Sequence, residues 1–266
     1  MGEALLVNAA ILVAIVLALW AISVRIGDVS FIDSFWGAGM GLMAIASFAQ
    51  LAEPGARARL LLAMTVIWGL RLGIHLFRRW WREGEDQRYA RMLKGARAQG
   101  RFASAALTRI WLGQALLLFL VSSPAQVGIL ASGEPAPLDN LARIGLALYA
   151  VGISFEWVGD WQLARFKADP ANEGRILDTG LWRYTRHPNY FGDACAWWGI
   201  WLVAASAGAT YAFSTIAGPL FLTFTLTRWS GKALLEAGMA KKRGAAYADY
   251  VRRTPGFFPW FPRAPG

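Results

Sequence analysis

The densest group of chemically useful side chains lies in residues 178–193, whose sequence is DTGLWRYTRHPNYFGD. Gly180 permits a turn, and Pro188 suits the first turn of a following helix, where its missing N–H group is not needed. Arg186 and His187 come directly before this predicted helix start. Because a helix N-terminus with a guanidinium group beside it is suited to bind phosphate, the segment predicts an anion site.

The same segment carries flat rings and an amide. Tyr184 and Tyr190 offer faces on which a nicotinamide or adenine ring can stack, and Asn189 has the donors and acceptors that suit a carboxamide. Asp193 lies about one turn into an apolar stretch, where an ionised carboxylate costs about 2.5–3.5 kcal/mol at the bilayer centre unless it is paired or wetted. We therefore expect Asp193 to face a polar cavity, and the combination favours a dinucleotide ligand.

Two carboxylates precede this segment. Glu156 and Asp160 are four residues apart, which places them on one face of a helix. Lys167, Asn172 and Arg175 follow in the predicted loop. Carboxylates can hold ribose or amide groups and cations can hold phosphates, so these residues extend the predicted cofactor site. The alternative is a structural salt-bridge patch that closes the loop over the helices.

Ionisable side chains also lie within or beside apolar stretches. Arg71 and His75 are four residues apart, and Asp33 opens an apolar stretch beside Trp36. Charged groups inside a membrane are functional candidates by default. The alternatives are that His75 caps a neighbouring carbonyl group and that Asp33 is an ordinary residue at a helix N-terminus. The sequence has neither a Walker motif nor a Cys/His cluster, so no metal site is expected.

The elements that position these residues are predicted to be membrane helices. The chain is 56% hydrophobic and 17% charged, whereas an average soluble domain is about 45–50% apolar and about 25% charged. Apolar runs long enough to cross a bilayer lie near residues 4–24, 31–52, 59–77, 105–131, 139–160, 190–207 and 210–229. Because backbone groups in lipid must be hydrogen-bonded within their own segment, we predict an all-α integral membrane bundle of seven transmembrane helices. The glycines of Gly37-Ala-Gly-Met-Gly41 are expected to allow close helix packing.

Charge separates the two sides of this predicted bundle. The chain has 27 Lys and Arg against 17 Asp and Glu, and with seven spans most of the basic residues fall on one side. The positive-inside rule places that side in the cytoplasm and the N-terminus outside. We therefore predict one transmembrane domain over residues 1–266, with cytoplasmic loops at 78–104 and 161–190 and a cytoplasmic amphipathic tail at 230–266. Basic loops between apolar spans favour membrane lipids over nucleic acid as partners, and loop 78–104 alternatively serves only as a topology signal.

The sequence GLWRYTRHPNYFGD, preceded by EWVGDWQLARFK, resembles the steroid 5α-reductase family, specifically its bacterial branch of DUF1295-type membrane proteins. The resemblance extends from FIDSFWG to the Tyr-rich tail and is strongest over residues 156–193. RHPxYxG is also similar to the motif of isoprenylcysteine carboxyl methyltransferases. The Asn of HPNY and the acidic residue after the following Gly are similar to the pattern of sterol and steroid reductases, which favours a reductase.

The resemblance implies NADPH as cofactor and reduction of a carbon–carbon double bond conjugated to a ketone. Family cofactor contacts match Asp160, Lys167, Arg175, Asn189, Asp193 and Arg228, whereas Glu156 stands where relatives often have Asn. The family anchors the substrate ketone with a Glu in its second helix and a Tyr in its third. Asp33 is similar to the Glu, and Leu76 falls at the Tyr position, so the second anchor is either missing or supplied by His75 or Tyr89. Asp33 is expected to be protonated or to share a proton.

The complete expectation is an NADPH-dependent oxidoreductase of lipid metabolism that acts on a CH–CH bond of a 3-oxo-Δ4 steroid or similar lipid-like enone. It is expected to be a monomer in a bacterial inner membrane. The alternatives are an S-adenosylmethionine-dependent membrane methyltransferase and a non-catalytic lipid-binding protein. The expected catalytic residues are Asp33, His75 and Tyr89, and the expected cofactor contacts are Glu156, Asp160, Lys167, Asn172, Arg175, Tyr184, Arg186, His187, Asn189, Tyr190, Asp193 and Arg228.

Overall fold

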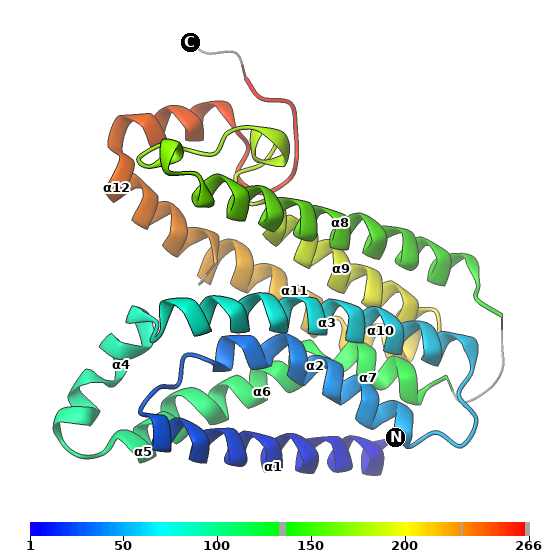
Figure 1. The fold of residues 1–266 in the computed structure, drawn as a ribbon. Helices are drawn as coiled ribbons and strands as arrows, with labels where there is room; N and C mark the ends of the chain where they lie inside the picture. The colour runs from blue at the N-terminus through cyan, green and yellow to red at the C-terminus, as the bar shows by residue number, and fades with distance from the viewer. Residues whose placement is uncertain (133–136, 230, 264–266) are drawn as a thin grey trace. The chain divides into compact units, whose positions relative to one another are not determined.

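The computed structural model describes residues 1–132, 137–229 and 231–263. These residues form helices joined by short connections, and no strand occurs among them (Figure 1). This confirms the all-α prediction. The chain is a membrane protein with transmembrane helices.

Six helices in the described part of the chain are long and apolar enough to cross a membrane: Gly2–Ile26, Ile32–Ala49, Ala56–Glu83, Phe102–Val121, Asn140–Ala168 and Ala209–Arg253. The predicted count of seven is therefore not confirmed. The difference is the predicted span 190–207, which forms helix α9 (Pro188–Ala205) but begins with polar residues that include Asn189 and Asp193. The predicted orientation of the termini and the bacterial inner membrane stay predictions.

The chain divides into two compact units. Unit 1 comprises residues Met1–Ala142 and Ile200–Gly218, and unit 2 comprises Arg143–Gly199 and Pro219–Gly266. In chain order the helices are α1 (Gly2–Ile26), α2 (Ile32–Ala49), α3 (Ala56–Glu83), α4 (Gln87–Ala98), α5 (Phe102–Ala106), η1 (Leu107–Trp111), α6 (Leu112–Val121), α7 (Ser123–Leu130), α8 (Asn140–Ala168), η2 (Pro170–Asn172), η3 (Gly180–Arg183), α9, α10 (Ala209–Thr215), α11 (Ala217–Phe224), η4 (Thr225–Trp229) and α12 (Lys232–Arg253).

The three predicted extramembrane segments are largely helical. Segment 78–104 contains the end of α3, all of α4 and the start of α5. Segment 161–190 contains the last two turns of α8 followed by η2, η3 and the start of α9, and the tail contains α12. Their cytoplasmic location and the single-domain description stay predictions.

In unit 1, α2 packs against α3 through glycines. A Cβ atom at Gly37 would lie 2.6 Å from the carbonyl oxygen of Gly69, and one at Gly73 would lie 3.1 Å from the carbonyl oxygen of Ser34. Only glycine therefore allows the two backbones to approach this closely. The predicted packing role of the glycines in residues 37–41 is confirmed at Gly37.

A buried polar network joins α1, α2 and α7 in the same unit. The Nδ2 atom of Asn8 donates to Ser47 Oγ at 2.7 Å and to Gln126 Oε1 at 2.9 Å. All three side chains are fully buried. In an apolar surrounding such groups must be hydrogen-bonded to one another, so the network fixes the register of three helices.

In unit 2, α8 and α9 cross at glycines. A Cβ atom at Gly192 would lie 2.5 Å from the carbonyl oxygen of Gly152 and 2.6 Å from the backbone nitrogen of Glu156. One at Gly199 would lie 2.6 Å from the carbonyl oxygen of Gly145. This close crossing places the polar first turns of α9 directly against the carboxylate-bearing half of α8.

Gly192→Ala is expected to destabilise the protein by about 1–3 kcal/mol, because the added methyl group meets backbone atoms that cannot rotate away. Gly95→Ala is the matched control, since a Cβ atom at Gly95 in α4 meets nothing within 4 Å. This control should gain about 0.5–1 kcal/mol from higher helix propensity. Chemical denaturation of both variants in detergent micelles measures the two changes, and equal stabilities for the two variants would contradict the close crossing.

Candidate functional site

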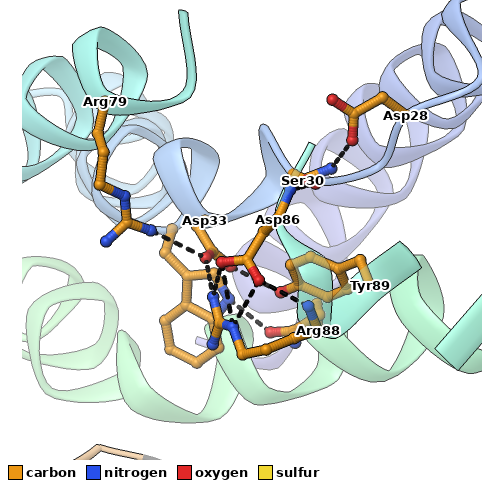
Figure 2. Close-up of polar contacts among 9 residues, drawn as sticks. Asp28, Ser30, Asp33, Arg79, Asp86, Arg88 and Tyr89 are labelled. Carbon is orange, nitrogen blue, oxygen red and sulfur yellow. Dashed lines mark hydrogen bonds and ion pairs between the residues drawn. The ribbon is translucent and has the colours of Figure 1, made fainter. Parts of the chain in front are cut away.

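A first polar cluster lies in unit 1, where the connection from α1 to α2 meets the connection from α3 to α4. Helix α1 ends at Gly27, whose positive φ of 71° allows the chain to turn. Asp28 then accepts hydrogen bonds from the backbone nitrogen of Ser30 at 2.7 Å and from Trp80 Nε1 at 2.7 Å. The hydroxyl of Ser30 accepts from the backbone nitrogen of Asp86 at 2.8 Å (Figure 2). These bonds hold the starts of α2 and α4 side by side.

Asp33 and Tyr89 form the centre of this cluster. The Tyr89 hydroxyl donates to Asp33 Oδ1 at 2.6 Å, and Arg88 Nη2 lies 2.7 Å from Asp33 Oδ2. A second guanidinium, that of Arg79, lies 3.7 Å from the same oxygen (Figure 2). Tyr89 is only 6% exposed. The structure therefore brings together two of the three residues that were predicted to be catalytic.

The surroundings of Tyr89 favour the protonated form of its hydroxyl. Burial, followed by the negative charge of Asp33, raises the pKa of the Tyr89 hydroxyl above its ordinary value. Asp86 caps the start of α4 through the backbone nitrogen of Arg88 at 2.8 Å and also binds its side chain. Burial opposes the ionised form of Asp86, but the Arg88 hydrogen bonds prevail and lower its pKa. Asp86 thus fixes the guanidinium that pairs with Asp33.

His75 lies in the second half of α3 and is half-buried. It stands one turn before Arg79, the α3 residue that pairs with Asp33. Arg71 lies a further turn before His75. His75 therefore belongs to the helix that supports the cluster, and its predicted catalytic role stays a prediction.

A second cluster lies in unit 2 just before α9. Arg186 Nε donates to Glu236 Oε1 at 2.9 Å, and His187 Nε2 lies 3.0 Å from the same oxygen. Arg186 also donates to the carbonyl oxygen of Val251 at 3.2 Å and to that of Thr254 at 2.5 Å. The segment before α9 is thereby bound to α12, and Arg186 and His187 are both buried.

His187 is further held by an aromatic contact. Its ring stacks on that of Tyr190 with 5.4 Å between centroids and 5° between planes. Burial lowers the pKa of His187 below its ordinary value, and the hydrogen bond and charge of Glu236 offset part of this effect. The folded protein therefore holds His187 in its neutral form more strongly than the unfolded chain does.

Acidification is expected to destabilise the fold through His187. A folded-state pKa below the ordinary value of about 6.5 means that the unfolded chain takes up this proton more readily, so stability is kept above about pH 6.5 and falls below it. Thermal unfolding of wild type and His187→Gln at several pH values measures this. The variant should lose less stability than wild type between about pH 7 and about pH 5.5, and parallel curves would contradict the prediction.

Four predicted cofactor residues lie at the crossing of α8 and α9. Asn189 Nδ2 donates to Asp160 Oδ1 at 2.9 Å, so these two residues are in direct contact. Glu156 and Asp193 are both buried, at 2% and 9% exposure. Glu156 and Asp160 therefore lie against the first turns of α9.

The remaining predicted residues lie around this crossing. Asn172 Nδ2 donates to the carbonyl oxygen of Phe166 at 3.1 Å and so closes the end of α8. Tyr184 is exposed and meets the ring of Phe261 edge-on at 6.3 Å between centroids. The exposed cationic members of the predicted set are Lys167, Arg175 and Arg228.

The last described residues form a strap over the segment before α9; we call residues 255–263 the C-terminal strap. The backbone nitrogen of Arg186 donates to the carbonyl oxygen of Pro255 at 2.9 Å, and the hydroxyl of Thr185 donates to that of Phe257 at 2.8 Å. The backbone nitrogen of Trp260 donates to the carbonyl oxygen of Tyr184 at 2.9 Å. The strap gives segment 184–186 backbone partners that helices α9 and α12 do not supply.

A family model described as "Protein of unknown function (DUF1295)" matches residues 19–254. The chain belongs to the DUF1295 family. This family is related to steroid 5α-reductase-like proteins. The match covers the side chains of both polar clusters of this DUF1295 protein and ends directly before the C-terminal strap.

Two other proteins are similar in sequence to this DUF1295 protein. An uncharacterized protein of Schizosaccharomyces pombe, C594.04c, is 26% identical over 271 residues, which cover 91% of this chain and 75% of the relative. The probable O-methyltransferase ustE of Ustilaginoidea virens is 36% identical over 98 residues, which cover 37% of this chain and 34% of the relative. Neither is named as a steroid reductase. No solved structure matches the chain.

Sequence reasoning missed several residues of this DUF1295 protein. Arg79 and Arg88 were read only as topology charges, and Glu236 only as part of an amphipathic surface helix. Asp86 carried a usable signal, because an Asp directly before a helix is a favoured N-cap. The pairing of Glu236 with Arg186 spans 50 residues and has no local signal.

Proposed function

We propose that this protein is an NADPH-dependent reductase of a carbon–carbon double bond conjugated to a ketone, in a 3-oxo-Δ4 steroid or a similar lipid-like enone. The observation that supports this most directly is the hydrogen bond of 2.6 Å between Tyr89 and Asp33. A buried phenol that keeps its proton and is oriented by a carboxylate is a suitable donor to a ketone oxygen. The resemblance to ketone-anchoring acid and Tyr pairs in the steroid 5α-reductase family agrees with it.

In this proposal Tyr89 donates a hydrogen bond to the ketone oxygen, which draws electron density from the conjugated double bond. Asp33 accepts the hydrogen bond of Tyr89 between turnovers and holds its ring in place, and Arg88 fixes the Asp33 carboxylate. NADPH, when bound, supplies the hydride that the β-carbon accepts. His75, one turn from the Arg79 pair, is proposed to act with this cluster.

The side chains of unit 2 have the chemistry that a nicotinamide dinucleotide requires. Lys167, Arg175 and Arg228 are exposed cations suited to phosphates. The carboxylate of Asp160 and the amide of Asn189 are suited to ribose hydroxyls and to a carboxamide. The remaining proposed contacts are Glu156, Asn172, Tyr184, Tyr190 and Asp193. Arg186 and His187 are proposed to support this set through Glu236 as well as to contact the cofactor.

A second candidate is an S-adenosylmethionine-dependent O-methyltransferase. It is favoured by the similarity to the probable O-methyltransferase of Ustilaginoidea virens, which shares 36% identity over 98 residues. In that case Arg186, His187 and the neighbouring cations would serve the carboxylate of the methyl donor. The Tyr89–Asp33 pair of unit 1 would then act on a hydroxyl or carboxyl acceptor.

Cofactor binding by the purified full chain separates these candidates. Tryptophan fluorescence titrations with NADPH and with S-adenosylmethionine give the two affinities, and NADPH oxidation is followed with a 3-oxo-Δ4 steroid. The proposal expects tight NADPH binding that is weakened at least about tenfold by Asn189→Ala or Asp193→Ala, because a buried polar partner is lost. Binding of S-adenosylmethionine alone would replace the reductase by the methyltransferase. Binding of neither would favour the non-catalytic lipid-binding reading.

A further inference from the structure

A pocket in unit 2 lies apart from both polar clusters. It has a volume of about 290 Å³ and is formed by the last turns of α8 and by the chain from η2 to η3. The side chains that define its chemistry are those of Trp161, Gln162, Arg165, Asp169 and Thr179.

Three hydrogen bonds hold the walls of this pocket in place. Gln162 Oε1 accepts from the backbone nitrogen of Leu181 at 3.0 Å, and the Asp169 side chain accepts from that of Ala171 at 2.9 Å. The third is the bond of 3.1 Å from Asn172 to the end of α8. Gly180, at a φ of 59°, turns the chain back toward α8. The pocket is therefore a fixed feature of the chain's local fold.

The pocket uses a different face of α8 from the proposed cofactor residues. Trp161 and Arg165 are four residues apart and form one row near the end of α8, and Asp169 directly follows the helix, whereas Asp160 and Lys167 belong to another row. Asn172, a proposed nucleotide contact, also lines the pocket, where its amide is bound to the carbonyl oxygen of Phe166. The proposed function leaves the pocket without an occupant.

The same row continues into the membrane-spanning part of α8 as an exposed apolar stripe. Val151, Trp157, Val158 and Trp161 are 47%, 50%, 40% and 58% exposed. Helix α8 is long and apolar enough to cross a bilayer. Trp side chains gather where hydrocarbon meets headgroup, and Arg and Lys near a helix end extend toward the headgroups. The pocket therefore lies at one end of a candidate membrane span, next to an exposed apolar stripe suited to acyl chains.

We propose that this pocket binds the headgroup of a zwitterionic phospholipid that carries a primary amine, as in phosphatidylethanolamine. The guanidinium of Arg165, which lies 5.6 Å from the Trp161 ring, is placed to bind the phosphodiester, and the hydroxyl of Thr179 is a further donor. The Asp169 carboxylate accepts from the ammonium group. Arg165 in the last turn of α8 and Asp169 directly after the helix line the same pocket, so one cation and one anion are available to a ligand that carries both charges.

Native mass spectrometry of the detergent-purified full chain tests this site. The probes are phosphatidylethanolamine, phosphatidylglycerol and the water-soluble glycerophosphoethanolamine, each added in turn. We expect phosphatidylethanolamine to be retained at least fivefold better than the other two. Arg165→Ala should lower its retention at least fivefold. Arg143→Ala, which removes an exposed cation nearer the other end of α8, is the matched control and should retain the lipid as wild type does.

Asp169→Asn makes the test specific for the amine. Asn also caps a helical turn, so the variant keeps the bond to Ala171 while it removes the charge. It should lower retention of phosphatidylethanolamine and leave that of phosphatidylglycerol unchanged or higher. Equal retention of both lipids by wild type, or unchanged phosphatidylethanolamine retention in both variants, would overturn the proposal. Retention of glycerophosphoethanolamine equal to that of the lipid would identify a soluble ligand instead and would also overturn it.

Discussion

Replacing Tyr89 with Phe is expected to lower kcat for reduction of a 3-oxo-Δ4 steroid by about 10²–10³-fold, because loss of one donor to a developing oxyanion costs this much. The dissociation constant of NADPH should stay unchanged, since its proposed contacts lie in unit 2. Burial and the negative charge of Asp33 raise the pKa of the Tyr89 hydroxyl. The phenol therefore stays protonated above pH 10, the ordinary pKa of tyrosine being about 10. The activity of wild type should therefore show no loss from phenol ionisation as the pH rises to about 10.

Asp33→Asn and Tyr211→Phe complete this experiment. The asparagine side chain introduced by Asp33→Asn would still accept the hydrogen bond from Tyr89 but would lack the charge that holds Arg88, so we expect a smaller loss than in Tyr89→Phe. Tyr211, in α10, is a Tyr outside both clusters, and its replacement should leave kcat unchanged. Full steroid reduction by Tyr89→Phe, with NADPH binding intact, would remove Tyr89 from the proposed chemistry.

Glu236→Ala is expected to destabilise the protein by about 3 kcal/mol, because it leaves the buried guanidinium of Arg186 without its carboxylate partner. Thermal and denaturant unfolding in detergent measure the loss. The Glu236→Ala variant should also bind NADPH more weakly, since Arg186 and His187 hold the segment that leads into α9.

Glu173→Ala is the matched control for this variant, because Glu173 is an exposed carboxylate in the same unit. Its removal should change stability by less than about 0.5 kcal/mol. The double variant Arg186→Met/Glu236→Leu tests whether the unpaired charge causes the destabilisation. Because this variant removes the guanidinium as well as the carboxylate, no uncompensated buried charge remains, and part of the lost stability should be recovered. Equal stability of Glu236→Ala and wild type would show that the ion pair does not support the fold.

The all-helical character of the protein followed from its apolar runs, because only helices satisfy the backbone within a spanning segment. The number of membrane-spanning helices did not follow as securely from the sequence. The run 190–207 was read as a span from its apolar second half, whereas its first turns, with Asn189 and Asp193, make α9 too polar as a whole. The start of α9 at Pro188 was predicted correctly, because proline is favoured in the first helical turn.

The two polar clusters were predictable to different degrees. The contact between Asp160 and Asn189 was not itself predicted; the two residues were only assigned to the same cofactor site. Tyr89 was only one of several options for the partner of Asp33, because 56 residues, including all of helix α3, separate them and no periodicity relates them. The pairing of α12 with segment 184–187 depends on tertiary packing, which the amphipathic pattern of α12 does not encode.

The C-terminal strap has a consequence for biosynthesis. The amide of Arg186 and the buried hydroxyl of Thr185 find their acceptors in Pro255 and Phe257, which follow α12 in the chain and are synthesised after it. A chain truncated after α12 would keep the six candidate membrane helices of the described residues and still lack these acceptors. A stop codon placed at position 255 should therefore yield a protein that inserts normally but is removed by cellular proteases.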